Sequence, residues 1–458
     1  MTLLDGAQAA AAAGAPTAPG ASQNNGTTST ADALDSSVQT QHQQPVVGGG
    51  GGGGAGVPEL GALRSHVVNT LREWYVLASD SIASLLDGRF LQHPPRDLWL
   101  LGRRYVIDAP PGEQSWHVSY PPSVLSDFSS LVWCTYRSQY PPISPSAFTT
   151  DAGWGCMLRA GQTLMAQALQ LHHLGRGWAF AWDSPDDADM RKREQYIRIV
   201  AQFFDDYLPS STFSIHRMAA LGKQFEGKDI GEWFGPSGTA RILAGLARQA
   251  QLEVCVYTTT DGVVYLADIC DEDEFRPTLI LVASMLGIDG VNPVYYPFIQ
   301  ASLMLPQSVG IAGGRPSSAL YFAGFQGDEL IYLDPHHTRP AVERREDGRY
   351  SSADLASYSC STPKRVAFSR LDPCMVFGYY CGSLESLIDL RSRIDLLADG
   401  GVATIISFDN GRSPAPAPPV NDAPEPASRQ GGLLTKLSAS PLGSSDGERS
   451  DEEWVTEL

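Results

Sequence analysis

The sequence has few basic residues, no long apolar run and no close pair of cysteines, and each absence excludes a class of protein. Of its 458 residues, 33 are Lys or Arg and 51 are Asp or Glu, which gives a formal net charge of −18. Nucleic acid is therefore not expected as the main ligand, because phosphate binding requires clustered Lys and Arg. The longest mostly apolar run, Leu279 to Ile288, is too short to span a bilayer. The N-terminus has no basic segment and carries Asp5, which argues against a signal peptide.

The seven cysteines form no Cys-x-x-Cys pair, which fits a reduced cytosolic protein better than a disulfide scaffold or a zinc site. We therefore predict no metal and no cofactor. One cysteine, Cys156, stands apart because a Gly-Trp-Gly sequence precedes it. The other six lie mostly in apolar contexts and are interpreted as structural: Cys134, Cys255, Cys270, Cys360, Cys374 and Cys381.

Composition changes sharply at both ends of the chain. Residues 1–57 are mainly Ala, Gly, Ser, Thr and Gln, and residues from 409 on are rich in Pro, Ala and Ser and then acidic. Such segments bury too little apolar surface to offset the entropy of ordering them. We expect disordered tails at 1–57 and 409–458 around one folded domain at 58–408.

The residues after the Gly-Trp-Gly sequence predict a helix that begins at Cys156 and ends before Gly175. Apolar residues recur at helical spacing between these two positions, and glycine is a common helix stop. A cysteine in the first turn lies against unpaired N–H groups and the positive end of the helix dipole, which favour the nucleophilic thiolate. The alternative is a buried cysteine that happens to begin a helix.

A second stretch offers a general base. Residues 320–325 and 329–333 read as two strands joined by Gln-Gly-Asp, and Asp334 and His336 follow the second strand. Residues two apart in extended chain project to the same face, so the carboxylate can orient the imidazole. An Asp-Pro turn followed by surface histidines is the alternative, and we accept it for His337. For Asp334 and His336 we favour the functional interpretation, because Cys156 needs such a base.

Four further features are read from local patterns. Residues 252–257 and 263–267 predict a hairpin around Asp261-Gly262, and Gly313 to Pro316 predict a flexible loop beside the two strands. Tyr136 is either a core aromatic or an O–H donor aimed at the site. Trp233 either packs at the entry of the following helix or forms the wall of a peptide cleft.

Together these residues make a set suited to thiol hydrolysis. Cys156 would attack a carbonyl carbon, His336 would take and return a proton, and Asp334 would orient His336. The Cys156 main-chain N–H and Tyr136 would hold the oxyanion.

Four segments resemble one known family. GWGCMLRAGQ, with WCTYR upstream and EWFGPSG and YLDPHHTRPAV downstream, is similar to the autophagins, the papain-like cysteine peptidases of autophagy. The resemblance runs in order from about Leu98 to Gly382. It implies an α+β, papain-like cysteine peptidase fold with a small inserted helical subdomain at roughly 183–250.

The resemblance also implies an activity and its partners. Such enzymes cut a ubiquitin-like autophagy modifier after its C-terminal glycine, which primes it for conjugation to phosphatidylethanolamine, and later release it from that lipid. They are required for autophagosome formation. The implied partners are the modifier and its phosphatidylethanolamine conjugate, without nucleic acid. Contact with autophagic membranes would be made only through the substrate. The implied location is the cytoplasm, with recruitment to the pre-autophagosomal structure and with the nucleus as an alternative.

By motif position, Cys156 resembles the nucleophile of the family, and Asp334 and His336 resemble the other members of its triad. Tyr136 resembles the oxyanion partner.

Two further elements are implied for the cleft of the enzyme. Trp233 resembles the cleft tryptophan of the family. Gly313, Gly314, Arg315 and Pro316 resemble the regulatory loop that covers the cleft until substrate lifts it.

The C-terminal residues resemble a modifier-docking motif, with Trp454 after acidic residues and Leu458 at the end. The strict motif requires a branched apolar residue three positions after the aromatic, where this chain has Glu457. Two rival classes stay open: another thiol enzyme, such as a deubiquitinase or an acyltransferase, and a non-catalytic adaptor that binds the modifier. The longer motifs argue against the first rival, and the intact Cys, His and Asp argue against the second.

Overall fold

The computed structural model describes residues 97–107, 120–180, 186–271 and 274–414. The predicted tails lie outside this range except for residues 409–414, and so does the docking motif of Trp454 and Leu458. No helix in this part of the chain has the length and apolarity needed to cross a membrane.

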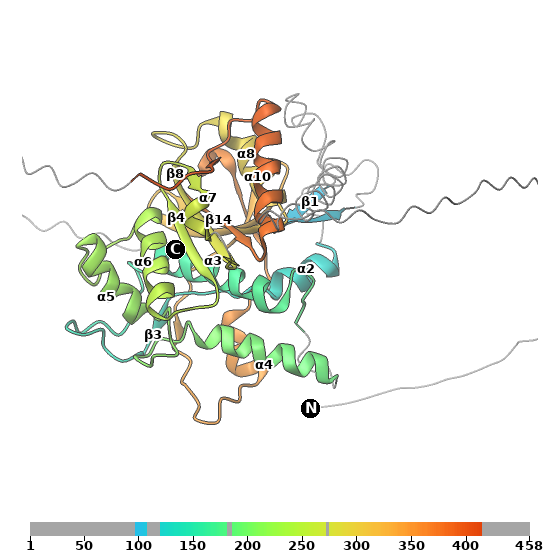
Figure 1. Ribbon diagram of the computed structural model, residues 1–458. Helices are drawn as coiled ribbons and strands as arrows, with labels where there is room; N and C mark the ends of the chain where they lie inside the picture. Colours follow the sequence, from blue (N-terminus) through green and yellow to red (C-terminus); the bar gives the residue numbers. More distant parts are fainter. Residues whose placement is uncertain (1–96, 108–119, 181–185, 272–273, 415–458) are drawn as a thin grey trace, which may run out of the picture. The chain divides into compact units, whose positions relative to one another are not determined.

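A mixed sheet of nine strands forms the centre of the described domain (Figure 1). Seven of the strands lie in the order β13 (Lys364–Ala367), β11 (Glu329–Leu333), β10 (Ser318–Gln326), β9 (Ser308–Arg315), β14 (Cys374–Cys381), β8 (Thr278–Met285) and β4 (Cys255–Thr259). The other two are β1 (Asp97–Leu100), which pairs with β10, and β2 (Arg103–Val106), which pairs with β1. All of these pairings are antiparallel except that of β4 with β8.

Short two-stranded sheets lie outside the central sheet, in the segments that connect the larger elements. They are β3 (Arg137–Ser138) with β12 (Arg339–Pro340), β5 (Val263–Tyr265) with β15 (Ser407–Asp409), and β6 (Cys270–Asp271) with β7 (Glu274–Phe275). The first pair matters for function, because it ties the residues after Tyr136 to those after His337.

Helices cover both faces of the sheet. One face packs against α3 (Cys156–Leu174) and α6 (Pro236–Gln249), with α2 (Pro122–Ser129), α4 (Asp187–Ala201) and α5 (Ile215–Glu226) in the same apolar cluster. The other face packs against α8 (Tyr296–Met304) and α10 (Leu384–Asp399). The remaining helical turns are α7 (Leu266–Ile269), α9 (Ser352–Leu355), η2 (Pro293–Tyr295), η3 (Ala356–Tyr358) and η4 (Phe368–Arg370).

The alternation of side chains along the central strands produces two separate cores. On β8, Leu279 and Leu281 belong to the cluster around α3, whereas Ile280 and Val282 belong to the cluster around α8 and α10. Successive side chains of a strand point to opposite faces, so a strand covered on both sides reads as a continuous apolar run. That explains the continuous apolar run on β8.

Helix α3 is buried along almost its whole length. Its polar side chains supply residues 132–134 with hydrogen bonds that a neighbouring strand would otherwise make. Gln167 Nε2 donates to the Val132 carbonyl at 3.0 Å, and the Gln170 amide accepts from Val132 N–H at 3.2 Å. Thr163 Oγ1 accepts from Cys134 N–H at 3.1 Å. Buried main-chain groups need such partners. The helix therefore fixes the segment that leads directly to Tyr136.

Several expected elements are confirmed. The helix begins at Cys156 and Gly175 caps it. The strands at 320–325 and 329–333 lie within β10 and β11, whose connection contains Gly327 at φ +62°. Residues 186–250 hold α4, α5 and α6, whose buried apolar residues share the cluster of α3, and the inserted subdomain at roughly 183–250 stays a prediction.

The predicted hairpin around Asp261-Gly262 is wrong. β4 pairs with β8 and β5 pairs with β15, so the two segments do not form a ladder with each other. The local turn is present, since Gly262 has φ +78° and the Asp261 carboxylate accepts from Val263 N–H at 3.0 Å. Turn chemistry is local, whereas the choice of strand partner depends on distant residues.

The predicted flexible loop at Gly313 to Pro316 is also wrong. Gly313, Gly314 and Arg315 belong to β9 and pair with β10, and only Pro316 and Ser317 form the turn between the strands. The glycines serve close packing here: a Cβ on Gly314 would lie 2.3 Å from the Ser318 carbonyl oxygen. The segment is therefore the end of a β-hairpin.

Candidate active site

The glycine turn before Cys156 is fixed by Asp151. The Asp151 main-chain carbonyl accepts from Gly155 N–H at 2.9 Å, and its carboxylate accepts from Arg137 N–H at 2.8 Å. A Cβ on Gly155 would lie 2.5 Å from the Asp151 carboxylate, so the close approach requires glycine. Gly155 is the N-cap of α3 and has no side chain to cap the first turn. Cys156 thus begins the helix beside its positive end.

A buried ion network anchors this turn to the helix. Arg159 donates two hydrogen bonds of 2.8 Å to Asp151 and one of 3.0 Å to Asp205. All three side chains are at most 1% exposed. A guanidinium in this position ties the loop before Cys156 to the helix that Cys156 begins, so the network sets the position of the thiol.

Replacing Arg159 with methionine is expected to lower the free energy of unfolding by about 3–5 kcal/mol, because two buried carboxylates lose their cation. Denaturant unfolding measures the change. The matched control is Arg198→Met on α4, whose side chain is 72% exposed and whose ion pair with Glu194 should contribute about 0.5 kcal/mol at most. Equal effects of the two substitutions would contradict the role given to the network.

Asp334 and His336 lie in the turn that follows β11. Oδ1 of Asp334 accepts from His336 Nδ1 at 2.7 Å and from the His336 main-chain N–H at 3.1 Å. One carboxylate oxygen therefore fixes both the ring and the backbone of His336, and the local structure is an Asx-type turn. The segment is not a strand, so this turn, rather than the alternation of an extended chain, brings the two side chains together. Nε2 of His336 is left to face Cys156.

The charges of this group support a thiolate and an imidazolium. Burial alone would raise the pKa of Cys156, but hydrogen bonds from His336, the Ala319 main-chain N–H and Tyr136 lower it overall. The hydrogen bonds of His336 to Asp334 and Cys156 raise its pKa to about 9. Burial opposes ionisation of Asp334, yet hydrogen bonds from His336 and Lys364 hold its pKa well below the usual range. Asp334 is therefore ionised at every pH at which the enzyme would work.

Tyr136 lies against both reacting groups. Its hydroxyl donates to Cys156 Sγ and accepts from the Gly153 N–H, and its ring packs edge-on to His336 at 5.4 Å. Its main-chain N–H donates to the Pro335 carbonyl at 2.9 Å. Burial, followed by the charge of Cys156, raises the pKa of Tyr136, so the hydroxyl keeps its proton.

Trp233 also contacts the nucleophile loop. Its Nε1 donates to the Gly153 carbonyl at 2.7 Å, while 56% of its surface stays exposed. An indole held at one end and exposed along its face suits the wall of a cleft better than a buried packing role. Pro316 is exposed at the tip of the β9–β10 hairpin, three residues from the Ala319 N–H that contacts Cys156.

His337 points elsewhere. It is exposed, its Nε2 lies 3.3 Å from Lys364 Nζ, and its ring packs edge-on to Trp133 at 5.5 Å. The structure thus brings together Cys156, Tyr136, Asp334 and His336 with their partners, and leaves His337 at the surface beside them.

Sequence reasoning missed three partners. Lys364 Nζ donates to Asp334 at 3.0 Å because β13 pairs with β11, a long-range contact without a local signal. The Ala319 N–H reaches Cys156 from β10, which is likewise a long-range contact without a local signal. Trp133 Nε1 donates to the Asp334 carbonyl at 2.9 Å; this residue opens the WCTYR segment, so its sequence signal was available.

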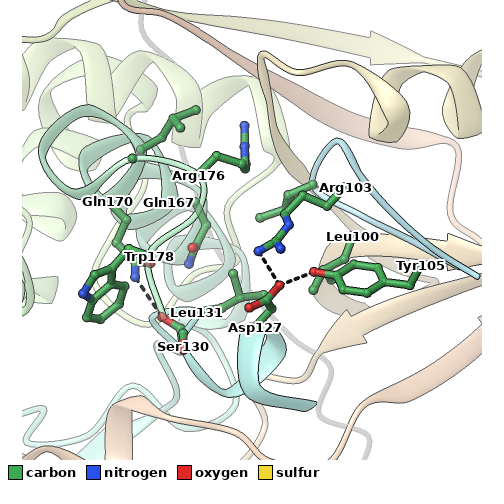
Figure 2. Close-up of a pocket in the computed structure, with 13 residues that line it drawn as sticks. Leu100, Arg103, Tyr105, Asp127, Ser130, Leu131, Gln167, Gln170, Arg176 and Trp178 are labelled. Atoms are coloured by element: carbon green, nitrogen blue, oxygen red, sulfur yellow. Dashed lines mark hydrogen bonds and ion pairs between the residues drawn. The ribbon is translucent and has the colours of Figure 1, made fainter. Parts of the chain in front are cut away.

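A separate hollow lies away from these residues (Figure 2). It has a volume of about 480 Å³, open solvent included, and lies between β1, β2, α2 and the end of α3. Asp127 in its wall accepts from Tyr105 and pairs with Arg103 at 2.5 Å. No residue predicted for catalysis lines it, so the hollow is distinct from the Cys156 group.

The pH dependence of thiol reactivity follows from these pKa directions. We expect the ion pair to persist between the lowered pKa of Cys156 and the raised pKa of His336, so kcat/KM falls on the basic side near pH 9. Asp334→Asn removes the main cause of the raised pKa of His336 and should move this basic limit to lower pH. The pH profile of kcat/KM measures the basic limit in the unsubstituted chain, and an NMR titration of the His336 ring, which needs no turnover, measures the pKa behind it in both chains. A basic limit that Asp334→Asn leaves unchanged would contradict the assignment.

Comparison with known proteins gives matches along most of the described domain. The family model of the peptidase C54 catalytic domain matches residues 121–393. A probable cysteine protease atg4 of Penicillium rubens is 36% identical over 347 residues, 66% of this chain and 84% of that protein. The cysteine protease atg4 of Emericella nidulans is 35% identical over 372 residues, 70% of this chain and 89% of that protein. The cysteine protease ATG4 of Pyricularia oryzae is 37% identical over 354 residues, 69% of this chain and 68% of that protein.

Proposed function

The chain belongs to the peptidase C54 family and is a cysteine peptidase that processes the ubiquitin-like modifier of autophagy, and we propose that Cys156 is its nucleophile. The observation that carries this proposal is the convergence of His336, Tyr136 and the Ala319 N–H on the thiol of the first residue of α3. Each of these groups favours thiolate over thiol, and thiolate is the species that attacks a carbonyl.

The proposed reaction has two halves. The Cys156 thiolate attacks the carbonyl carbon of the modifier's C-terminal glycine, a C–S bond forms, and the π pair moves to oxygen. His336 Nε2–H gives its proton to the leaving nitrogen as the C–N bond breaks. In the second half, His336 takes a proton from water, the hydroxide attacks the thioester, and Cys156 leaves as thiolate.

We propose that the Cys156 N–H and Tyr136 hold the oxyanion. The Tyr136 hydroxyl donates to the thiolate at rest and accepts from the Gly153 N–H. When the sulfur becomes bonded to carbon it loses its charge, so the hydroxyl can redirect its donated hydrogen to the new oxyanion. Donors already held in place for developing charge are the usual source of such stabilisation.

The finer features implied by the family resemblance belong to the same proposal. They are a papain-like arrangement of the domain, with α4, α5 and α6 as its inserted helices, and release of the modifier from phosphatidylethanolamine. Both the peptide and the lipid amide carry the same glycine carbonyl, so one thiolate and one base serve both reactions. The surrounding protein needs only to admit a different leaving amine.

The test is the mass of a modifier precursor after incubation with the full chain. We expect one product that ends at the glycine, and the same truncated modifier from a phosphatidylethanolamine conjugate in vesicles. A precursor that keeps its mass while the enzyme is folded would overturn the proposed substrate. Cleavage of the precursor but not of the conjugate would overturn the delipidation step alone.

We also propose that the tip of the β9–β10 hairpin, together with Trp233, covers the thiol until the modifier binds. Pro316→Ala and Trp233→Ala should raise the rate at which iodoacetamide labels Cys156, and bound modifier should raise the rate in the unsubstituted chain. Met285→Ala, at an exposed position on β8, is the control. Equal labelling rates in the free unsubstituted chain, in its complex with the modifier, in Pro316→Ala and in Trp233→Ala would show that nothing covers the thiol.

A further inference from the structure

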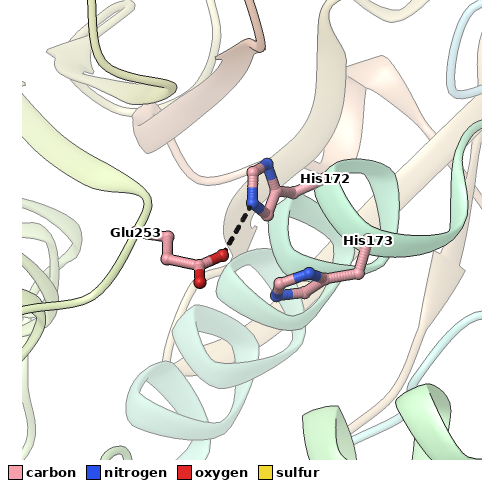
Figure 3. A group of neighbouring side chains, drawn as sticks. All are labelled: His172, His173 and Glu253. Atoms are coloured by element: carbon pink, nitrogen blue, oxygen red, sulfur yellow. Dashed lines mark hydrogen bonds and ion pairs between the residues drawn. The ribbon is translucent and has the colours of Figure 1, made fainter.

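Two adjacent histidines and a glutamate converge at the far end of the catalytic helix (Figure 3). His172 and His173 occupy the last turn of α3, and Glu253 lies in the connection between α6 and β4. One ligand atom from each of the three lies within 4.8 Å of the others. In Figure 3 both rings are turned toward the side from which Glu253 approaches.

The ring of His172 is held by a partner behind it. Its Nδ1 lies 2.5 Å from the Tyr380 hydroxyl, and the two rings pack edge-on at 5.8 Å. Tyr380 is only 7% exposed, on β14. With the proton on Nδ1 and donated to Tyr380, Nε2 presents a lone pair to the outside. Histidines that bind metals are usually oriented by such an outer hydrogen bond.

Glu253 has a fixed backbone and an exposed side chain. The neighbouring Leu252 donates its N–H to Ala247 at 3.1 Å and accepts from Arg276 at 3.0 Å, and Val254 is buried. The Glu253 carboxylate is 80% exposed and can turn at little cost.

We propose that His172, His173 and Glu253 bind one zinc ion. Two imidazole nitrogens and one carboxylate are a ligand set that zinc favours, with water in the fourth position. His172 Nε2 and Glu253 Oε2 lie 3.4 Å apart, long for a hydrogen bond between charged groups. That separation matches the edge of a tetrahedron whose bonds are about 2.1 Å long. The negative end of α3 adds to the attraction for a cation.

The proposed ion would brace the enzyme without taking part in catalysis. His172 follows Cys156 by sixteen residues, so the site lies about 24 Å along α3 from the thiol. It would join this helix to the connection that enters β4. The spacing of the cysteines predicts no metal, whereas the two histidines and the glutamate lie some eighty residues apart in sequence. The proposal stands independently of the reaction at Cys156.

The test is a zinc titration of the full chain carrying Cys156→Ala, so that the catalytic thiolate cannot compete for the ion. A chromophoric zinc indicator reports affinity and stoichiometry. We expect one equivalent bound, a rise in Tm with zinc, and its reversal by a chelator. His173→Gln and Glu253→Gln should each weaken binding at least about tenfold. Both residues are exposed, so Tm without zinc should not change.

Matched controls separate this site from others. His337→Gln replaces an exposed histidine beside the catalytic group, and Glu194→Gln replaces a carboxylate on α4 that is 67% exposed. Neither should change the zinc affinity. The proposal is overturned if no equivalent binds, if His173→Gln and Glu253→Gln leave the affinity unchanged, or if His337→Gln weakens it as much as they do.

Discussion

Cys156→Ala is expected to abolish cleavage of the modifier precursor while the modifier still binds. The substitution removes the atom that attacks the carbonyl and leaves the hydrogen bonds of the glycine turn in place, because those bonds use Asp151 and main-chain groups. Loss of one member of a nucleophile–base unit typically lowers the rate by ~10⁴-fold or more. Precursor processing followed by mass spectrometry, with a pull-down of the modifier, measures both effects.

The chain offers a matched cysteine for this experiment. Cys374 is half-buried at the start of β14, and burial raises the pKa of its thiol. Cys374→Ala should retain the activity of the unsubstituted chain, because a neutral thiol without a base is not a nucleophile. Turnover by Cys156→Ala near that of the unsubstituted chain would mean that the reaction uses another residue.

Asp334→Asn and His336→Ala are each expected to lower kcat by about 10⁴-fold. His336 carries both the hydrogen bond to Cys156 and the proton that the leaving amine needs. Asp334 accepts from Nδ1 of that ring at 2.7 Å, so asparagine would remove the charge that stabilises the imidazolium and fixes its tautomer. Single-turnover kinetics separates this loss of chemistry from a loss of binding.

The neighbouring histidine is the control. His337→Ala should change the rate little, since His337 is exposed and contacts Trp133 and Lys364. If His337→Ala were the inactive variant and His336→Ala retained activity, His337 rather than His336 would be the base.

Local chemistry made much of the candidate site predictable. The helix at Cys156 begins after a glycine N-cap and ends before a glycine C-cap, and both signals directly flank the helix in the sequence. The proximity of Asp334 and His336 is likewise set within three residues by a turn. Asp334 and His336 do lie together, but a turn joins them, and not the extended chain from which their proximity was predicted.

Long-range pairing explains what sequence reasoning could not find. Two glycines suggested a loop at 313–316, yet Gly314 is needed for the close approach of β9 to β10, and a Cβ on Gly313 would lie 2.9 Å from Met375 Cγ on β14. Lys364 and the Ala319 N–H reach the site only because the sheet places β13 beside β11 and β10 beside α3. Strand partners depend on the hydrophobic surfaces of the whole sheet, so their order is not written in any single segment.

The most direct test of the proposed site uses a modifier whose C-terminal glycine carries an electrophile in place of the scissile bond. The full chain should form a one-to-one adduct, and peptide mapping should locate it on the sulfur of Cys156. Cys156→Ala should give no adduct, and His336→Ala should form it far more slowly. An adduct on any other of the seven cysteines, or precursor cleavage without an adduct on Cys156, would contradict the account.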